Sequence, residues 1–204
     1  MPAPSYTKSE VAVHELGHCL FALAVELDWE HVRVFQKNGQ WVGQCRLAAP
    51  RTEIPLATLC AFQMGGPIVQ IQLIPESLGQ HITNFKPSLF ARASQPPDAL
   101  TDMLNAVLWA SDLAGEAAPM MQMAPNGLRP DWMKLHFGDF LWLPQLEGIC
   151  HELAAAAGAG AFIDELHPKL VSQGQLSVNT CIEAFDRTVG SNTCNKLRDF
   201  ITRY

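Results

Sequence analysis

The sequence predicts a mainly α-helical domain of the α+β class, with one small β-hairpin or sheet after its first helix. Apolar residues recur at helical spacing from Ser9 to Leu27 and again in several later segments. They alternate with polar residues on either side of Asn38-Gly39. Of the 204 residues, 48% are hydrophobic and 17% are charged, so the chain has enough apolar surface for a sizeable core.

The first helix is expected over residues 9–27. After it, the spacing of the apolar residues changes from helical to alternating. Its candidate N-cap residues are Ser5, Thr7 and Ser9. Residues 31–35 and 41–47 alternate apolar and polar side chains and are expected to form the two strands of a hairpin. The Asn38-Gly39 pair between them is a strong turn signal.

A second helix is expected over residues 54–73, with an interruption at Gly65-Gly66-Pro67. Residues 75–97 are rich in Pro, Ser, Gln and Asn, and this composition favours a long loop or insertion. The next helix begins near Pro96 and runs to about Leu113, because proline is tolerated in the first turn of a helix.

The C-terminal part of the chain, residues 119–204, is expected to be helical and to pack on the same domain as residues 1–118. Its expected helices cover about 144–157, 160–172, 178–188 and 192–203. Gly174 and Gly190 are expected to end two of them, because glycine is the common residue just past a helix C-terminus.

Composition and charge exclude several classes of partner. The net charge is −6 and no basic run occurs, whereas nucleic-acid binding needs clustered Lys and Arg. No apolar run approaches the roughly 18 residues that span a bilayer, so no membrane span is expected. Six scattered cysteines without a CxxC pair, and no apolar leader at the N-terminus, predict reduced thiols in a cytoplasmic protein.

The segment His14-Glu15-Leu16-Gly17-His18 carries the clearest chemical signal. Two histidines at positions i and i+4 lie on one face of a helix, so both imidazoles can reach one metal ion. Glu15 is then placed to take a proton from the attacking water. A chain of this composition contains such a pattern by chance about once in a hundred sequences. The motif therefore predicts a zinc site, with His14 and His18 as ligands and Glu15 as the catalytic base.

A zinc site needs a third protein ligand, and the sequence leaves its identity open. The spacing H-x-x-G-x-x-H is absent after His18, which excludes the metzincin pattern. Glu147 and Glu152 are the glutamates that a later helix could supply. His31 and His81 are candidate substrate-binding groups near the ion.

The first 110 or so residues resemble the peptidase domain of FtsH-type zinc proteases. The resemblance rests on Val13–Leu23 with its His-Glu-x-x-His motif, on the hairpin with its glycine turn, and on Met64–Val69 with its Gly-Gly pair. In that family a later helix begins with the aspartate that is the third zinc ligand. Residues 102–110 fit the family's pattern Asp-h-x-x-Ala-x-x-h-Ala, where h is apolar, and the resemblance therefore implies Asp102. The alternatives are Asp98, which is also a natural N-cap, and Asp112.

Two departures from the family limit what the resemblance implies. Gln70 stands where the family has a glutamate after the Gly-Gly segment, and no G-x-x-x-x-G-K-[ST] loop or membrane anchor occurs in this sequence. The implied activity is therefore an ATP-independent zinc metallopeptidase that cleaves peptides or unfolded protein segments. Its implied partners are further copies of itself or a separate ATPase. The alternatives are a non-catalytic zinc-containing protein that acts in binding or assembly, and a helical interaction protein without metal.

Overall fold

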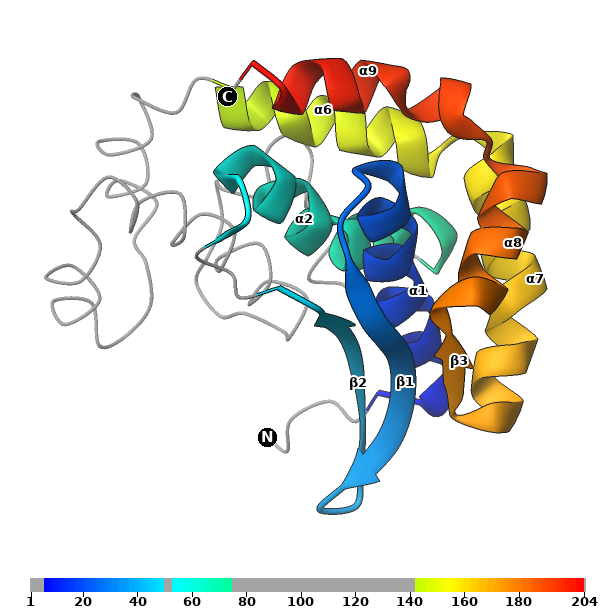
Figure 1. Cartoon of the computed structure of the whole chain (residues 1–204). Helices are drawn as coiled ribbons and strands as arrows, with labels where there is room; N and C mark the ends of the chain where they lie inside the picture. Colours follow the sequence, from blue (N-terminus) through cyan, green and yellow to red (C-terminus); the bar gives the residue numbers. More distant parts are fainter. Residues whose placement is uncertain (1–5, 50–52, 75–141, 204) are drawn as a thin grey trace, which may run out of the picture.

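Helix α1, Lys8–Ala24, is the element against which the sheet and most of the other helices pack (Figure 1). The structure is a computed structural model that describes residues 6–49, 53–74 and 142–203. Helix α2, Leu56–Leu73, lies along one side of α1, and strands β1 and β2 cover another. Twelve of the 17 residues of α1 are buried, as expected of a helix that is enclosed on several sides.

A capping box starts α1. The Thr7 hydroxyl accepts a hydrogen bond from the Glu10 backbone N–H at 3.2 Å, and the Glu10 carboxylate accepts one from the Thr7 N–H at 2.7 Å. Of the three candidate caps, the structure therefore uses Thr7. The helix ends at Ala24, three residues before the predicted end, and Glu26 follows with a left-handed φ of 57°.

The sheet contains three antiparallel strands in the order β2-β1-β3. Strands β1, Trp29–Lys37, and β2, Gln40–Leu47, form the predicted hairpin. The turn residues Asn38 and Gly39 have φ values of 52° and 78°, as a two-residue turn with two left-handed positions requires. The mainly helical α+β class predicted from the sequence is thereby confirmed.

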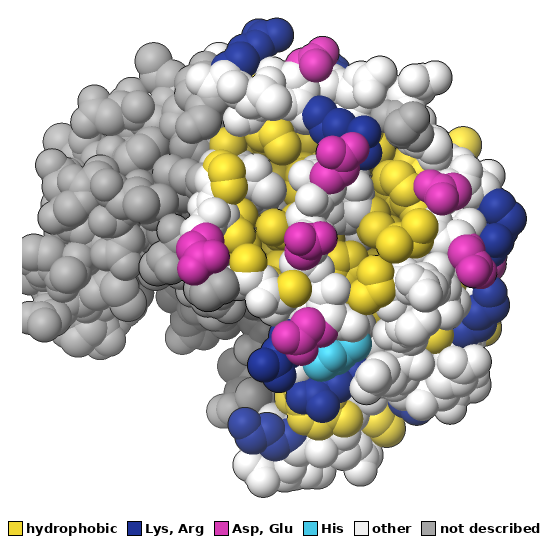
Figure 2. Space-filling view, in the orientation of Figure 1, with side chains coloured by type: hydrophobic (Ala, Val, Ile, Leu, Met, Phe, Trp, Pro, Cys, Tyr) yellow, Lys and Arg dark blue, Asp and Glu magenta, His cyan; other side chains and the backbone are white. Residues whose placement is uncertain are grey.

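The two faces of the hairpin differ in burial and charge. Val32 and Val34 are buried on the face toward α1, while Arg33 alternates with them and donates to the side-chain oxygen of Gln44 at 2.7 Å. Lys and Arg side chains gather over the hairpin in Figure 2.

Strand β3, Gln175–Ser177, is the element that sequence reasoning missed. A turn between two helices was expected here, but Leu176 pairs with Val32 of β1. The Val34 N–H also donates to the Gly174 carbonyl at 2.8 Å. Three residues are too few to show an alternation of apolar and polar side chains. Their partner strand also lies far away in the sequence, so no local pattern predicts this pairing.

Helix α2 runs without a break through Gly65-Gly66-Pro67, so the predicted interruption is wrong. The glycines allow close approach of α1. A Cβ atom added to Gly65 would lie 2.7 Å from the Gly17 carbonyl oxygen, and one added to Gly17 would lie 2.5 Å from the Gly65 carbonyl oxygen. The glycines that locally indicate a helix break thus allow the close packing of α2 against α1.

The C-terminal helices pack on α1 and α2 and share their core. Their bounds are α6 Trp142–Ala154, α7 Ala157–Gln173, α8 Val178–Thr188 and α9 Ser191–Ile201. Each lies within three residues of its predicted position. Gly174 ends α7 in a left-handed conformation, as predicted, and Gly190 separates α8 from α9. The predicted boundary near residue 118, the insertion at 75–97 and the helix near 96–113 lie outside the described residues.

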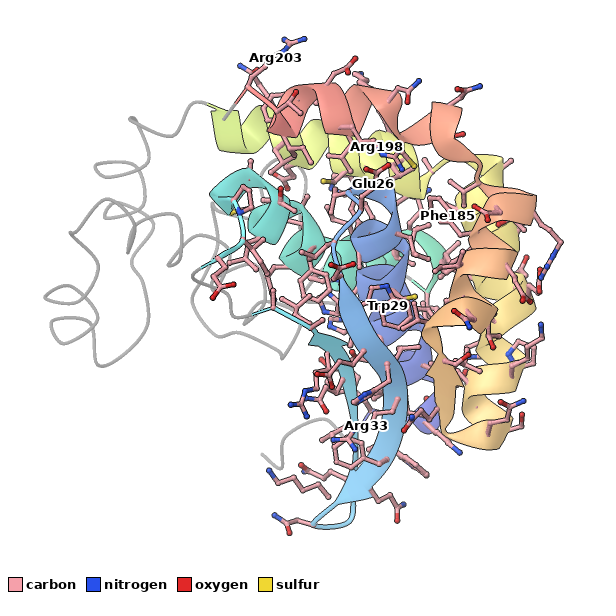
Figure 3. The ribbon with its side chains drawn as sticks, in the orientation of Figure 1. Glu26, Trp29, Arg33, Phe185, Arg198 and Arg203 are labelled. Carbon is pink, nitrogen blue, oxygen red and sulfur yellow. The ribbon has the colours of Figure 1, made fainter. Side chains whose placement is uncertain are left out.

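Arg198 of α9 contacts the C-terminal end of α1 (Figure 3). Its Nε donates to the Ala24 carbonyl at 2.8 Å, and its guanidinium forms an ion pair with Glu26 at 2.8 Å. A cation at a helix C-terminus also interacts favourably with the helix dipole. Among the described helices, none is long and apolar enough to cross a membrane.

Gly17→Ala is expected to destabilise the fold by about 1–3 kcal/mol, although alanine is the better helix former. The added methyl would meet the backbone of α2 at 2.5 Å, and backbone cannot rotate away as a side chain can. Urea unfolding of wild type and variant measures the loss. Gly160→Ala in α7 is the matched control, because a Cβ there meets nothing within 4 Å. Equal midpoints for both variants would contradict the close crossing of α1 and α2.

Candidate metal centre

The two histidines of the HELGH segment lie one turn apart on α1 with their rings in contact. Their Nε2 atoms are 3.1 Å apart, and the ring planes are nearly perpendicular. His18 is 6% exposed, whereas His14 is partly exposed. The helix thus brings the two imidazoles to one point, as the i, i+4 spacing predicts.

Helix α2 supplies a hydrogen-bond partner for the other nitrogen of each ring. His18 Nδ1 lies 2.8 Å from the Phe62 carbonyl oxygen, and His14 Nδ1 lies 2.9 Å from the side-chain oxygen of Gln70. A carbonyl oxygen can only accept, so His18 Nδ1 carries the proton and its Nε2 presents a lone pair. Gln70 holds His14 in the same arrangement. Such contacts to the second nitrogen are typical of metal-binding histidines.

Because Gly66 has no side chain, it leaves open the space that the Nε2 atoms of His14 and His18 face. Phe62, Gly66 and Gln70 follow one another at four-residue intervals, so they form one stripe along α2. A Cβ added to Gly66 would lie 2.5 Å from His18 Nε2 and 2.8 Å from His14 Nε2. Any larger residue at this point would fill the position where the two rings converge.

These features fit a zinc ion. With Nδ1 protonated on both rings, the two Nε2 atoms, 3.1 Å apart, present their lone pairs to the same point. Two nitrogen ligands of a tetrahedral zinc ion, each about 2.0–2.1 Å from the metal, lie about 3.3 Å apart. The observed separation is within a few tenths of an ångström of that value.

Glu15 points from α1 toward strand β2 and is 7% exposed. Its side chain lies against Gly43, where an added Cβ would come within 2.2 Å of Cγ and 2.5 Å of Oε1. The same carboxylate acts on the neighbouring thiol of Cys45, whose pKa is raised by desolvation and further by the charge of Glu15. Glu15 is therefore held between the first helix and the hairpin, beside the two histidines in the sequence.

The described residues add no third ligand to the histidine pair. Within them, no group of three or more His, Cys, Asp or Glu side chains is placed to hold a metal ion. Glu152 forms an ion pair with Lys196 on the surface, and Glu147 lies 4.0 Å from His151. The preferred candidate Asp102 and its alternatives Asp98 and Asp112 lie outside the described residues, so the third ligand stays a prediction.

The remaining histidines take other positions. His31 alternates with the buried Val32 in β1 and so lies on the sheet face away from α1. His167 bonds the hydroxyl of Ser9 at 2.9 Å and ties α7 to the start of α1. Burial lowers the pKa of His151. His81 and His136 lie outside the described residues.

Sequence reasoning missed three contributors to this site. The resemblance left the role of Gln70 in doubt because a glutamate was expected there, yet Gln70 contacts His14 directly. Gly43 was noticed only as a residue of the hairpin, and the Phe62 carbonyl is a backbone group without a side-chain signal. The four-residue spacing of Phe62, Gly66 and Gln70 is visible in the sequence. Only the crossing of α2 with α1 shows that these residues lie beside the two histidines.

Comparison with known proteins adds no independent evidence about the site. No protein-family model matches the chain, and no curated protein matches it.

Proposed function

We propose that this protein is a zinc-dependent metallopeptidase that hydrolyses peptides or unfolded protein segments. His14 and His18 would hold the ion, with Asp102 as the proposed third ligand. Glu15 would be the general base. A bound zinc ion would polarise the scissile carbonyl and lower the pKa of the attacking water.

The observation that carries the proposal is the arrangement of the two imidazoles. His18 Nδ1 donates to the Phe62 carbonyl, and Gln70 accepts from His14 Nδ1. Both rings therefore direct the lone pairs of Nε2 toward the space above Gly66. An outer hydrogen bond that fixes the tautomer in this way is typical of metal-ligating histidines.

The position of Glu15 supports catalysis as well as metal binding. A non-catalytic zinc site has no use for a base next to its ligand, and such sites usually close the fourth position with a protein ligand. Here a carboxylate that is 7% exposed is packed against a glycine of the sheet. Its confinement would hold the carboxylate in one place, so that it could accept a proton from water without first being ordered.

Strand β2 supports a peptide as the substrate. In the part of the chain that the structure describes, β2 pairs only with β1 and forms the edge of the sheet. Gly43, which contacts Glu15, lies near its middle. An extended peptide that added to this edge would pass the carboxylate and gain backbone hydrogen bonds whatever its sequence.

Zinc content and cleavage of an unfolded substrate test the proposal together. Wild type purified without chelators is expected to contain close to one zinc per chain and to cleave casein, with activity lost on chelation and restored by zinc. His14→Ala is expected to lack both metal and activity. Wild type without zinc would overturn the proposal. Zinc without cleavage of casein or of a peptide library would favour the non-catalytic alternative.

Three further expectations stay predictions. The cytoplasmic location rests on the cysteine pattern, and all six cysteines are free thiols in the structure. Association into homo-oligomers and delivery of substrate by a separate ATPase rest on the resemblance alone.

A further inference from the structure

We infer that Gln70 is a positioning residue that holds His14 in its Nδ1-protonated tautomer and thereby sets the metal affinity of the site. The inference rests on the proposed zinc site, but it concerns a hydrogen bond that exists without the metal.

The contact joins a buried side chain, Gln70, to the partly exposed His14. Gln70 is 3% exposed on α2, and its side-chain oxygen lies 2.9 Å from His14 Nδ1. With the oxygen facing the ring, Nδ1 must donate, and Nε2 is left as a lone-pair donor to a metal. With the amide reversed, its NH₂ would donate to Nδ1, and the proton would move to Nε2 and block metal binding. The orientation of this amide therefore decides whether His14 can be a ligand.

The two ligands differ in how their tautomers are fixed. His18 Nδ1 donates to the Phe62 carbonyl, and no side-chain substitution removes a backbone carbonyl. His14 depends on a side chain, so its tautomer can be changed by a single substitution. His18 is consequently an internal control for any measurement on His14.

The chemical nature of Gln70 gives a second consequence. An amide is a neutral acceptor, whereas a carboxylate in its place would make the imidazole a more basic ligand. The chain is thus expected to bind zinc more weakly than the same site with a glutamate at position 70. Loss of an outer partner of this kind usually changes metal affinity by about 10–100-fold.

The first experiment measures tautomers in the metal-free protein by ¹⁵N NMR of the histidine rings. Both His14 and His18 are expected to carry the proton on Nδ1 in wild type. In Gln70→Leu, His14 is expected to shift toward the Nε2-protonated form while His18 is unchanged. Gln70→Glu should restore the Nδ1-protonated form of His14. An unchanged His14 tautomer in Gln70→Leu would overturn the inference.

The second experiment measures zinc affinity by competition with a chelator. Gln70→Leu is expected to bind zinc about 10–100-fold more weakly than wild type, and Gln70→Glu more tightly. Gln63→Leu is the matched control, because Gln63 is 5% exposed on the same helix and makes none of the described hydrogen bonds to the two rings. Equal weakening by Gln63→Leu and Gln70→Leu would contradict a specific role for Gln70. If wild type binds no zinc, the proposed function fails, whereas the NMR result still decides the tautomer.

Discussion

Replacing Glu15 with Gln is expected to lower the rate of peptide cleavage by at least about a hundredfold while the zinc content stays that of wild type. The amide has almost the shape of the carboxylate but cannot accept a proton from water. Hydrogen bonds to α2 fix the tautomers of His14 and His18, so metal binding should be unaffected. Single-turnover cleavage of a fluorogenic peptide and metal analysis of the same sample give the two values. Cleavage at the wild-type rate by a zinc-loaded Glu15→Gln protein would rule out the proposed role of Glu15.

Gly43→Ala provides a second way to disturb the same carboxylate without changing its charge. The added Cβ would meet the Glu15 side chain at 2.2 Å and displace it. Cleavage should fall and zinc content should not, in parallel with Glu15→Gln. Circular dichroism and the unfolding midpoint show whether the hairpin survives the substitution, and only a folded variant is compared.

Gly66→Ala is expected to abolish stoichiometric zinc binding, with an affinity loss on the order of a hundredfold or more, beyond the usual effect of an outer-shell substitution. The methyl group would occupy the space between the two imidazoles, 2.5 Å from one Nε2 and 2.8 Å from the other. The rings can rotate away because they are side chains, so the helix is expected to remain folded. Zinc content after dialysis against buffer, read beside the circular dichroism spectrum, tests this expectation.

Gly148→Ala in α6 is the control for the Gly66 variant. It makes the same chemical change within a helix at a position where a Cβ meets nothing within 4 Å. Zinc content should be unchanged, and stability should rise by about 0.4–1 kcal/mol because alanine restricts the unfolded chain. A Gly66→Ala protein that holds zinc as firmly as Gly148→Ala would show that the metal does not bind where the two Nε2 atoms converge.

Local patterns were sufficient for most of the described secondary structure. The i, i+3, i+4 recurrence of apolar residues placed α1 and the C-terminal helices to within three residues, because each buries one continuous side. Asn38-Gly39 placed the hairpin because few other dipeptides adopt two left-handed conformations. The pairing of His14 with His18 also follows from the sequence, since the pitch of a helix fixes which residues share a face.

Only the tertiary structure decided how the residues around that pair are used. Gly65-Gly66-Pro67 reads locally as a helix break, but contact with Gly17 of α1 makes it the crossing point of two helices. Likewise, Leu176 joins β1 through a pairing that no neighbouring residue specifies.

The same distinction holds for the candidate site. The sequence by itself determined the two candidate ligands and the base, because all three lie within one turn and a half of a single helix. The tertiary structure decided their surroundings: the Phe62 carbonyl, the Gln70 amide and the gap at Gly66, which come from α2, and Gly43, which comes from β2. Those groups are distant in the sequence and meet α1 only because burial of apolar surface brings α2 and the hairpin against it.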